Sequence, residues 1–377
     1  MKMKALCIGH TTYDISLPVN GYPLENGKYY LKEKFESSGG GASNAAFLLA
    51  KWNVETFFSG VVGYDDFGTF IKKEMEKGNI KTSFLETNYD KKTSTSFILI
   101  NQENHTRTIF NVQPEEFHLK KYEYDMVPDL IYLDGYEYSA SVTAMNKYSN
   151  AISFLDASLP TKNLMALARD VKYLLCSIEF AEGVAGAKID FNNPVTLLTV
   201  YKRVKDRFPK SEIIITLKQH GALYCVNNEV KQMPPLAVAE VDRTAAGDIF
   251  RAAFSYAIGS HYDLEKAVRV ANIAAGLSTA KLGGKESIPT LSEIKNHYET
   301  RFGPIETKNE VDSISQKEIE NNPSVTSPSF NNVSKNSQIS PQQNNGIPPI
   351  NPTVNAFLNN QAPVNTPNNS QTPPNTP

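Results

Sequence analysis

Three short, mainly apolar segments, separated by stretches long enough to hold a helix, set the strongest limit on the fold of this chain. They span residues 130–133, 152–155 and 173–176, and none contains a charged residue. A strand that is buried on both faces has this appearance, and successive parallel strands need a crossover connection, usually a helix. The rhythm therefore predicts an α/β fold with a parallel sheet and helices on both of its faces.

Two further segments extend the same sheet. Residues 5–9 form an apolar run that ends in a glycine, and residues 213–216 form another that ends in Thr216. In open parallel sheets, ligands bind outside the carboxyl ends of the strands. Asp14, which we expect in the loop after the first run, therefore lies where a ligand would be. On the residues alone, a turn or capping role for Asp14 is favoured over a ligand contact.

The composition limits the class of protein. The formal net charge is −2 over 377 residues, so no bulk basic field points to a nucleic-acid partner. The chain has neither an apolar run of membrane-spanning length nor an apolar signal core at its start, so we expect a cytoplasmic protein without a membrane partner. The cysteines lie in apolar runs without zinc-like spacing, which favours buried reduced thiols.

The last part of the sequence differs from the rest. From residue 304 it consists largely of Asn, Pro, Ser, Gln and Thr. Such a segment cannot bury enough apolar surface to offset the entropy lost on ordering. We therefore expect residues 304–377 to be a disordered tail, and residues 1–303 to form one large domain.

Residues 95–100 and 106–112 alternate between apolar and polar side chains around a polar turn. This pattern predicts a β-hairpin with one face in contact with solvent. Residues 28–37 have the character of a further extended, partly polar segment. These segments therefore form a β element that differs from the fully buried strands.

The stretch of residues 241–250 joins a predicted strand end to a predicted helix. Apolar residues at positions 250, 253, 254 and 257 have helical spacing. The helix is preceded by Ala245, Ala246 and Gly247. Free amides at a helix start form an anion site, and a carboxylate such as Asp248 beside that site is unfavourable unless it takes a proton. The alternative is a capping role for Asp248.

Gly39, Gly40 and Gly41 form the most permissive backbone in the chain and precede a helical pattern over residues 45–52. Asn44 lies at the expected helix start, where the ordinary role of Asn is a cap. A run of glycines alone is weak evidence for a binding site.

Together, these stretches resemble the two signatures of the ribokinase-like (PfkB) carbohydrate kinase family. Gly39 or Gly40 with Asn44 fits the Gly-Gly-x-x-x-Asn pattern, and residues 242–248 fit Asp-Thr-x-Gly/Ala-Ala-Gly-Asp with Arg243 in place of Thr. The resemblance covers residues 4 to about 300. It implies a three-layer αβα sandwich with a small β-sheet lid built from about residues 11–37 and 93–112.

The resemblance also implies an activity. It implies an ATP-dependent phosphotransferase that acts on an alcohol group of a sugar or sugar-like substrate. Asp248 would be the general base, with an anion hole formed by the backbone of Ala245, Ala246 and Gly247. The implied substrate contacts are Asp14, Gly39, Gly40 and Asn44.

The nucleotide would lie near a second set of residues. The resemblance implies Thr216, Lys218, Gly221, Arg243 and Asn272. Lys218 replaces a family glycine, and a lysine beside a polyphosphate is favourable, although a solvated loop lysine is the plain alternative. Arg243 would be an additional clamp on the γ-phosphate or would face solvent.

The implied cofactors are ATP and Mg²⁺, and the resemblance allows K⁺ near Asp242. The residues that hold the metal stay unknown, because the relatives' Asn-x-x-Glu is replaced by Ser177 and Phe180. Glu179 is a weak substitute. The resemblance also allows a homodimer formed through the lid.

Two alternatives to a sugar kinase stay open. One is a nucleoside kinase on the same fold. The other is a non-catalytic sensor that binds a sugar or a nucleotide.

Overall fold

The computed structural model describes residues 2–305 except residues 105, 116 and 282. The chain divides into two units, Met1–Val325 and Thr326–Pro377, and the second lies wholly outside the described residues. Apart from residues 304 and 305, the segment for which we expect disorder also lies outside them.

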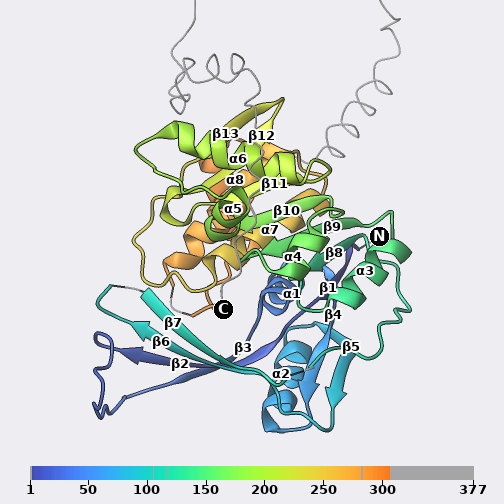
Figure 1. Cartoon of the computed structure of the whole chain (residues 1–377), viewed down its shortest axis with the longest axis vertical. Coiled ribbons are helices and arrows are strands. Elements are labelled where there is room, and N and C mark those ends of the chain that lie inside the picture. The colour runs from blue at the N-terminus through green and yellow to red at the C-terminus, as the bar shows by residue number, and fades with distance from the viewer. Residues whose placement is uncertain (1, 105, 116, 282, 306–377) are drawn as a thin grey trace, which may run out of the picture. The chain divides into compact units, whose positions relative to one another are not determined.

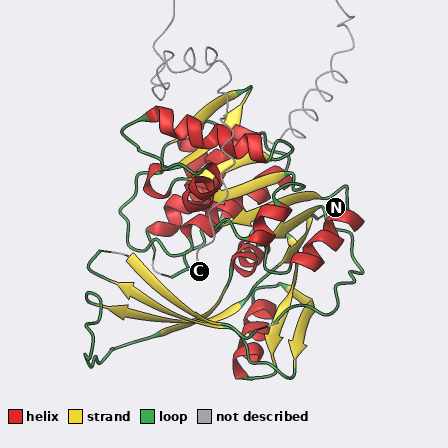
Figure 2. Ribbon diagram, in the orientation of Figure 1, coloured by secondary structure: helices red, strands yellow, loops and turns green. Residues whose placement is uncertain are grey.

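A nine-stranded sheet forms the centre of the first unit (Figures 1 and 2). In spatial order its strands are β13 (Glu229–Met233), β12 (Ala222–Val226), β11 (Glu212–Thr216), β10 (Tyr173–Ser177), β9 (Ile152–Ala157), β8 (Leu130–Leu133), β1 (Lys4–Ile8), β4 (Glu55–Gly63) and β5 (Lys81–Asn88). The seven strands from β11 to β5 pair in parallel, and β12 and β13 add an antiparallel edge. The predicted parallel sheet is confirmed.

Helices cover both faces of this sheet. They are α1 (Gly41–Lys51), α2 (Asp66–Lys77), α3 (Tyr138–Lys147), α4 (Lys162–Leu167), α5 (Ile178–Ala185), α6 (Pro194–Arg207), α7 (Ala246–Gly259), α8 (Leu264–Thr279) and α9 (Leu291–Phe302). Ala5 and Cys7 of β1 pack in the core that includes α1, α2, α7, α8 and α9, whereas Leu6 and Ile8 pack in the core of α3 to α6. Alternate residues of one strand thus face opposite layers, which is why the strands are apolar throughout.

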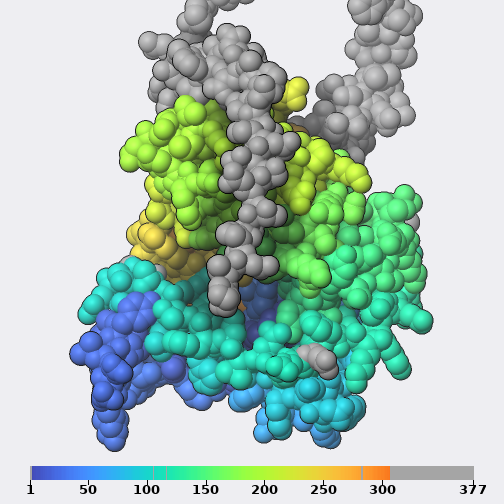
Figure 3. All heavy atoms as spheres, in the orientation of Figure 1, coloured from blue at the N-terminus to red at the C-terminus, as the bar shows by residue number. Residues whose placement is uncertain are grey.

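A second, four-stranded sheet stands apart from the first (Figure 1). Its order is β3 (Phe35–Gly39), β2 (Thr12–Val19), β6 (Thr95–Asn101) and β7 (Thr106–Val112). Its strands belong to the N-terminal part of the chain, whose blue and cyan atoms gather below the green and yellow ones in the space-filling view (Figure 3). We call this sheet the lid. The sandwich with a small second sheet agrees with the predicted fold class.

None of the helices in the described part of the chain is both long and apolar enough to cross a lipid bilayer.

Candidate active site

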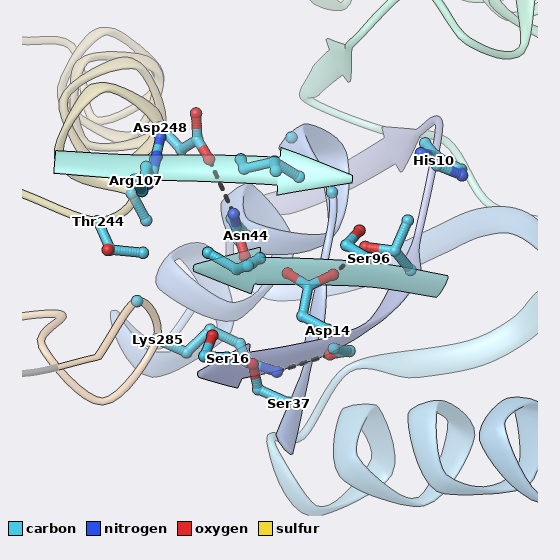
Figure 4. A pocket seen from close by; sticks show the side chains of 18 of the residues that line it. His10, Asp14, Ser16, Ser37, Asn44, Ser96, Arg107, Thr244, Asp248 and Lys285 are labelled. Atoms are coloured by element: carbon cyan, nitrogen blue, oxygen red, sulfur yellow. Dashed lines mark hydrogen bonds between the residues drawn. The ribbon is translucent and has the colours of Figure 1, made fainter. Parts of the chain in front are cut away.

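A cavity of about 1400 Å³ is lined by the lid, by the ends of strands β8 and β9, and by the start of α7. Asp14 of the lid, Asn44 of α1 and Asp248 of α7 all line it, although they lie far apart in the sequence (Figure 4). The structure thus brings together the three polar residues that were predicted for the acceptor site.

Asp248 lies in the first turn of α7, with both carboxylate oxygens engaged. Asn44 Nδ2 donates to its Oδ2 at 2.8 Å (Figure 4). Arg251 Nη2 donates to Asp248 Oδ1 at 2.7 Å. The N-cap of α7 is Ala245 and that of α1 is Gly40, and neither cap makes a side-chain hydrogen bond. The capping alternatives for Asp248 and Asn44 are therefore wrong.

The backbone before Asp248 has the shape of an anion site. Ala245 adopts a left-handed conformation with φ of 57°, and α7 starts at the next residue. Among the described residues, the amides of Gly247 and Asp248 donate to no backbone carbonyl, as expected in the first turn of a helix. A Cβ on Gly247 would lie 3.2 Å from Arg251 Nη1, so this glycine leaves room for the guanidinium.

Arg251 connects Asp248 to a second buried carboxylate. Its Nε lies 2.8 Å from Asp156 Oδ1, and the side chains of Arg251 and Asp156 are only 7% and 5% exposed. Tyr132 donates its hydroxyl to the other oxygen of Asp156 at 2.9 Å. Burial opposes the charge on Arg251, but the two carboxylates outweigh it and raise the pKa of the guanidinium. Sequence analysis missed Arg251, although the i, i+3 spacing from Asp248 was a usable signal.

Asp14 lies within β2, so the structure places it in a strand and not in the loop or turn we expected. Thr12 donates its hydroxyl to Asp14 Oδ1 at 2.5 Å. Burial raises the pKa of Asp14, while hydrogen bonds from Thr12 and Ser96 oppose that shift. The carboxylate is thus partly desolvated and faces the cavity, as a group that binds hydroxyls should.

The two predicted glycines are required by close contacts. A Cβ on Gly39 would lie 1.9 Å from Asp14 Oδ2, and one on Gly40 would lie 2.3 Å from the carbonyl oxygen of His10. Gly40 also has φ of 100°, which favours glycine. Gly40 lines the cavity, whereas Gly39 packs beneath Asp14.

Asp134, directly after β8, is a half-buried residue that sequence analysis did not assign. Its carboxylate accepts hydrogen bonds from the amides of His10 at 2.8 Å, Ala42 at 3.2 Å and Tyr136 at 3.0 Å. Burial raises its pKa to about 6. Asp134 therefore fixes the loop after β1 against the start of α1.

Lys285 links the loop before α9 to the lid. Its Nζ donates to Ser38 Oγ at 2.6 Å and to Glu74 Oε2 at 2.7 Å, and the side chain is 8% exposed. No local pattern predicts contacts between residues more than two hundred positions apart.

The five residues predicted for the nucleotide lie elsewhere. They are Thr216, Lys218, Gly221, Arg243 and Asn272, and none of these described residues lines the cavity. Thr216 ends β11, Lys218 begins a short 3-10 helix (η1, Lys218–His220), and Gly221 follows it with φ of 84°. Their assignment stays a prediction.

Three of these side chains already have protein partners. Lys218 forms an ion pair with Glu179, and Arg243 Nε lies 2.8 Å from Glu240 Oε2. Asn272 Nδ2 donates to the carbonyl oxygen of Pro234 at 2.8 Å. A nucleotide phosphate would have to compete with these contacts.

Asp242 stabilises the loop that precedes α7. Its two carboxylate oxygens accept from the amides of Thr244 at 2.8 Å and Gly283 at 3.0 Å. Within the part of the chain that the structure describes, no three His, Cys, Asp or Glu side chains are grouped as a metal site would require.

Comparison with known proteins places this geometry in a family. The model of the pfkB family carbohydrate kinases matches residues 2–291. A ribokinase of Bacillus subtilis is 24% identical over 301 residues, which cover 78% of this chain and 99% of that protein. A nucleoside kinase of Methanocaldococcus jannaschii is 22% identical over 299 residues, which cover 78% of this chain and 97% of that protein.

The solved structures agree with this match at the level of the fold. Arabidopsis thaliana ribokinase, solved with ribose and ATP, superposes with a TM-score of 0.65 at 19% identity and covers 78% of this chain and 98% of its own. The predicted enzyme class, a phosphotransferase with an alcohol group as acceptor, is confirmed by the family match. The chain belongs to the pfkB family of carbohydrate kinases.

Proposed function

We propose that this chain transfers the γ-phosphoryl group of ATP to a hydroxyl of a sugar or sugar-like acceptor, with Asp248 as the general base. The observation that carries the proposal is the direct hydrogen bond between Asn44 and Asp248 in the cavity that Asp14 also lines. Asp14 and Asn44 would hold acceptor hydroxyls, and Asp248 would take the proton of the attacking one. A positioned general base contributes about 10²–10⁴-fold in rate.

The amides at the start of α7 would stabilise the negative charge on the transferring phosphoryl group. The amides of Gly247 and Asp248 and the positive end of the helix meet at this point. Of the predicted anion hole at Ala245, Ala246 and Gly247, this placement supports Gly247, because the amide of Ala246 already donates to the carbonyl oxygen of Arg243 at 3.4 Å. Loss of one comparable donor costs about 3 kcal/mol in other enzymes.

Thr216, Lys218, Gly221, Arg243 and Asn272 would contact the nucleotide. Lys218 supports this role most directly, because its ion pair with Glu179 joins two side chains that are 62% and 41% exposed. A pair with this exposure is weak and exchanges readily for a phosphate. Lys218 would then contribute a positive charge beside the polyphosphate.

Mg²⁺ would enter with ATP, where it neutralises phosphate charge. Asp156, which lines the cavity, is paired with Arg251, and Glu179, the weak substitute for the family's metal-linked residue, is paired with Lys218. Both oxygens of Asp242 already bind backbone amides, which supports a loop-holding role over a K⁺ site.

A homodimer through the lid is the last part of the proposal. Phe97 and Phe110 are directly opposite each other on the lid face that points away from the cavity, and they are 39% and 55% exposed. Sedimentation of wild type and Phe110→Ser tests the proposed dimer. Loss of the exposed apolar surface at Phe110 should shift a dimer to monomer.

The kinase proposal is tested by an ADP-release screen with sugars, polyols, sugar phosphates and nucleosides. We expect wild type with Mg-ATP to release ADP with at least one acceptor, and Asp248→Asn to release none above background. If wild type binds ATP but no compound stimulates ADP release, a sensor function replaces the kinase function.

A further inference from the structure

The cavity-facing side of the lid changes in character from one row of side chains to the next. Paired strands place residues side by side in rows across a sheet. The row that contains Asp14 consists of Ser37, Asp14, Ser96 and Asn111. All four side chains are polar, and all four line the cavity.

The next row, two residues farther along each strand, is mainly apolar. It consists of Phe35, Ser16, Ile98 and Ile109, and all four line the cavity. Phe35 is 49% exposed and Ile109 is 44% exposed. Ile98, between them, is 6% exposed, so the apolar surface that faces open space in this row belongs to Phe35 and Ile109.

The cavity wall outside the lid is lined mainly by polar residues, with Phe70 and Tyr136 as aromatic ones. It includes Asp248, Arg251, Lys285 and Glu286. Of the described residues outside the lid that line the cavity, only Leu164 and Val241 are large aliphatic residues. Closure of the apolar row directly onto this wall would bury polar groups without partners, which is unfavourable.

We propose that the acceptor carries a neutral apolar or aromatic group on its sugar, and that this group lies under Phe35, Ile98 and Ile109. The inference rests on the proposed kinase function and adds the class of acceptor. Sugar hydroxyls face the polar row with Asp14, and the attached group covers the apolar row. Aryl glycosides and nucleosides belong to this class, and free monosaccharides do not.

General properties of binding sites support this division. An apolar patch exposed in a cleft marks a ligand-binding groove. Ligand pockets combine apolar walls with a few polar groups that fix orientation. Here the two kinds of surface are in adjacent rows of one sheet, so a single amphipathic ligand can contact both.

Matched acceptor pairs test the proposal. Each pair is a free sugar and its phenyl glycoside, and ribose is also paired with adenosine. For the pair that wild type uses best, we expect kcat/KM to be at least about tenfold higher with the substituted member, because a single methylene in an apolar pocket is worth about 10–200-fold.

The variant Ile109→Thr should reduce that preference at least about fivefold, mainly through KM, and change kcat/KM for the free sugar less than about twofold. The exposure of Ile109 makes the change compatible with folding. Val112→Thr is the matched control, because Val112 lies on the same strand, is 59% exposed and does not line the cavity. Val112→Thr should leave kcat/KM unchanged for both members of the pair.

The inference would be overturned if kcat/KM for the free sugar were equal to or higher than that for the substituted member in every pair. It would also be overturned if Ile109→Thr changed kcat/KM equally for both members. If no acceptor supports ADP release, the proposed kinase function fails. The proposal of an apolar group on the ligand is then tested by calorimetric binding of the free sugars and their phenyl glycosides. Tighter binding of a phenyl glycoside by wild type than by Ile109→Thr then supports it, and binding of neither member overturns it.

Discussion

Asp248 and Lys218 stand at the two ends of the predicted site, and their surroundings differ. Asp248 is bound by Asn44 and by the buried Arg251, which also pairs with Asp156. Lys218 is bound by one exposed partner, Glu179. In the proposed function, the acceptor end is therefore held by protein contacts before substrate arrives, whereas the nucleotide end would have to exchange protein contacts for phosphate contacts. The following predictions test this difference.

The largest expected effect concerns Arg251→Leu. Removal of this cation leaves two neighbouring carboxylates without compensation, and breaking a buried pair costs about 3–5 kcal/mol. Urea denaturation at pH 7 should show this loss in the free energy of unfolding, with a smaller loss for Arg251→Lys. A loss below about 1 kcal/mol, the range of exposed pairs, would show that the two ends are equally weakly held.

Asn44→Ala should impair use of the acceptor. A hydrogen bond to a charged group is worth about 1.5–3 kcal/mol, so kcat/KM for the acceptor should fall about 10- to 150-fold. The dissociation constant of ATP, measured by calorimetry, should not change. Weaker ATP binding by this variant would contradict the separation of the two ends.

Lys218→Ala should have the opposite selectivity and a smaller effect. Loss of one charge-assisted contact to phosphate should raise KM for ATP about three- to tenfold and leave KM for the acceptor unchanged. Lys210→Ala is the matched control, because Lys210 forms an exposed pair with Asp170 at 3.2 Å and does not line the cavity. Identical kinetics for both variants would refute a nucleotide role for Lys218.

The last prediction concerns Glu137, whose neighbour Tyr136 lines the cavity, and its effect per pH unit is small. Burial raises its pKa from 4.5 to about 7. The folded protein therefore keeps this proton while the unfolded chain loses it, so wild type loses stability as pH rises between these values. The slope is at most about 1.4 kcal/mol per pH unit.

Glu137→Gln should remove this part of the pH dependence and keep an acceptor for the amide of Leu119, which Glu137 Oε2 binds at 3.0 Å. Unfolding curves at several pH values measure the difference. Parallel pH profiles for wild type and variant would show that Glu137 is ionised in the folded protein at neutral pH.

Local patterns in the sequence were sufficient for the parallel strands β1, β8, β9, β10 and β11 of the main sheet and for the start of α7. Strands such as β8 are buried on both faces, so their composition indicates their position. Strands β12 and β13 were missed, although the Asn227–Asn228 turn between them, with φ of 52° and 63°, suits a tight hairpin. Asn residues tolerate positive φ, so two consecutive Asn residues are a short but usable sequence signal for a hairpin turn.

Other parts of the site could not be predicted from local patterns. Lys285 donates hydrogen bonds to Glu74 and Ser38, and Asp134 accepts hydrogen bonds from the amides of His10 and Ala42. These contacts depend on how distant segments pack, and no spacing in the sequence encodes them. The division of the lid into polar and apolar rows likewise depends on strand register across four strands.

The measurement that tests the account most directly compares kcat of wild type and Asp248→Asn with the same acceptor, with ATP binding measured on both preparations. We predict that kcat falls at least about a hundredfold in the variant while the dissociation constant of ATP stays the same, because a base acts on the proton and not on nucleotide affinity. A variant that retains more than about a tenth of the wild-type rate would contradict the assignment of Asp248 as the base.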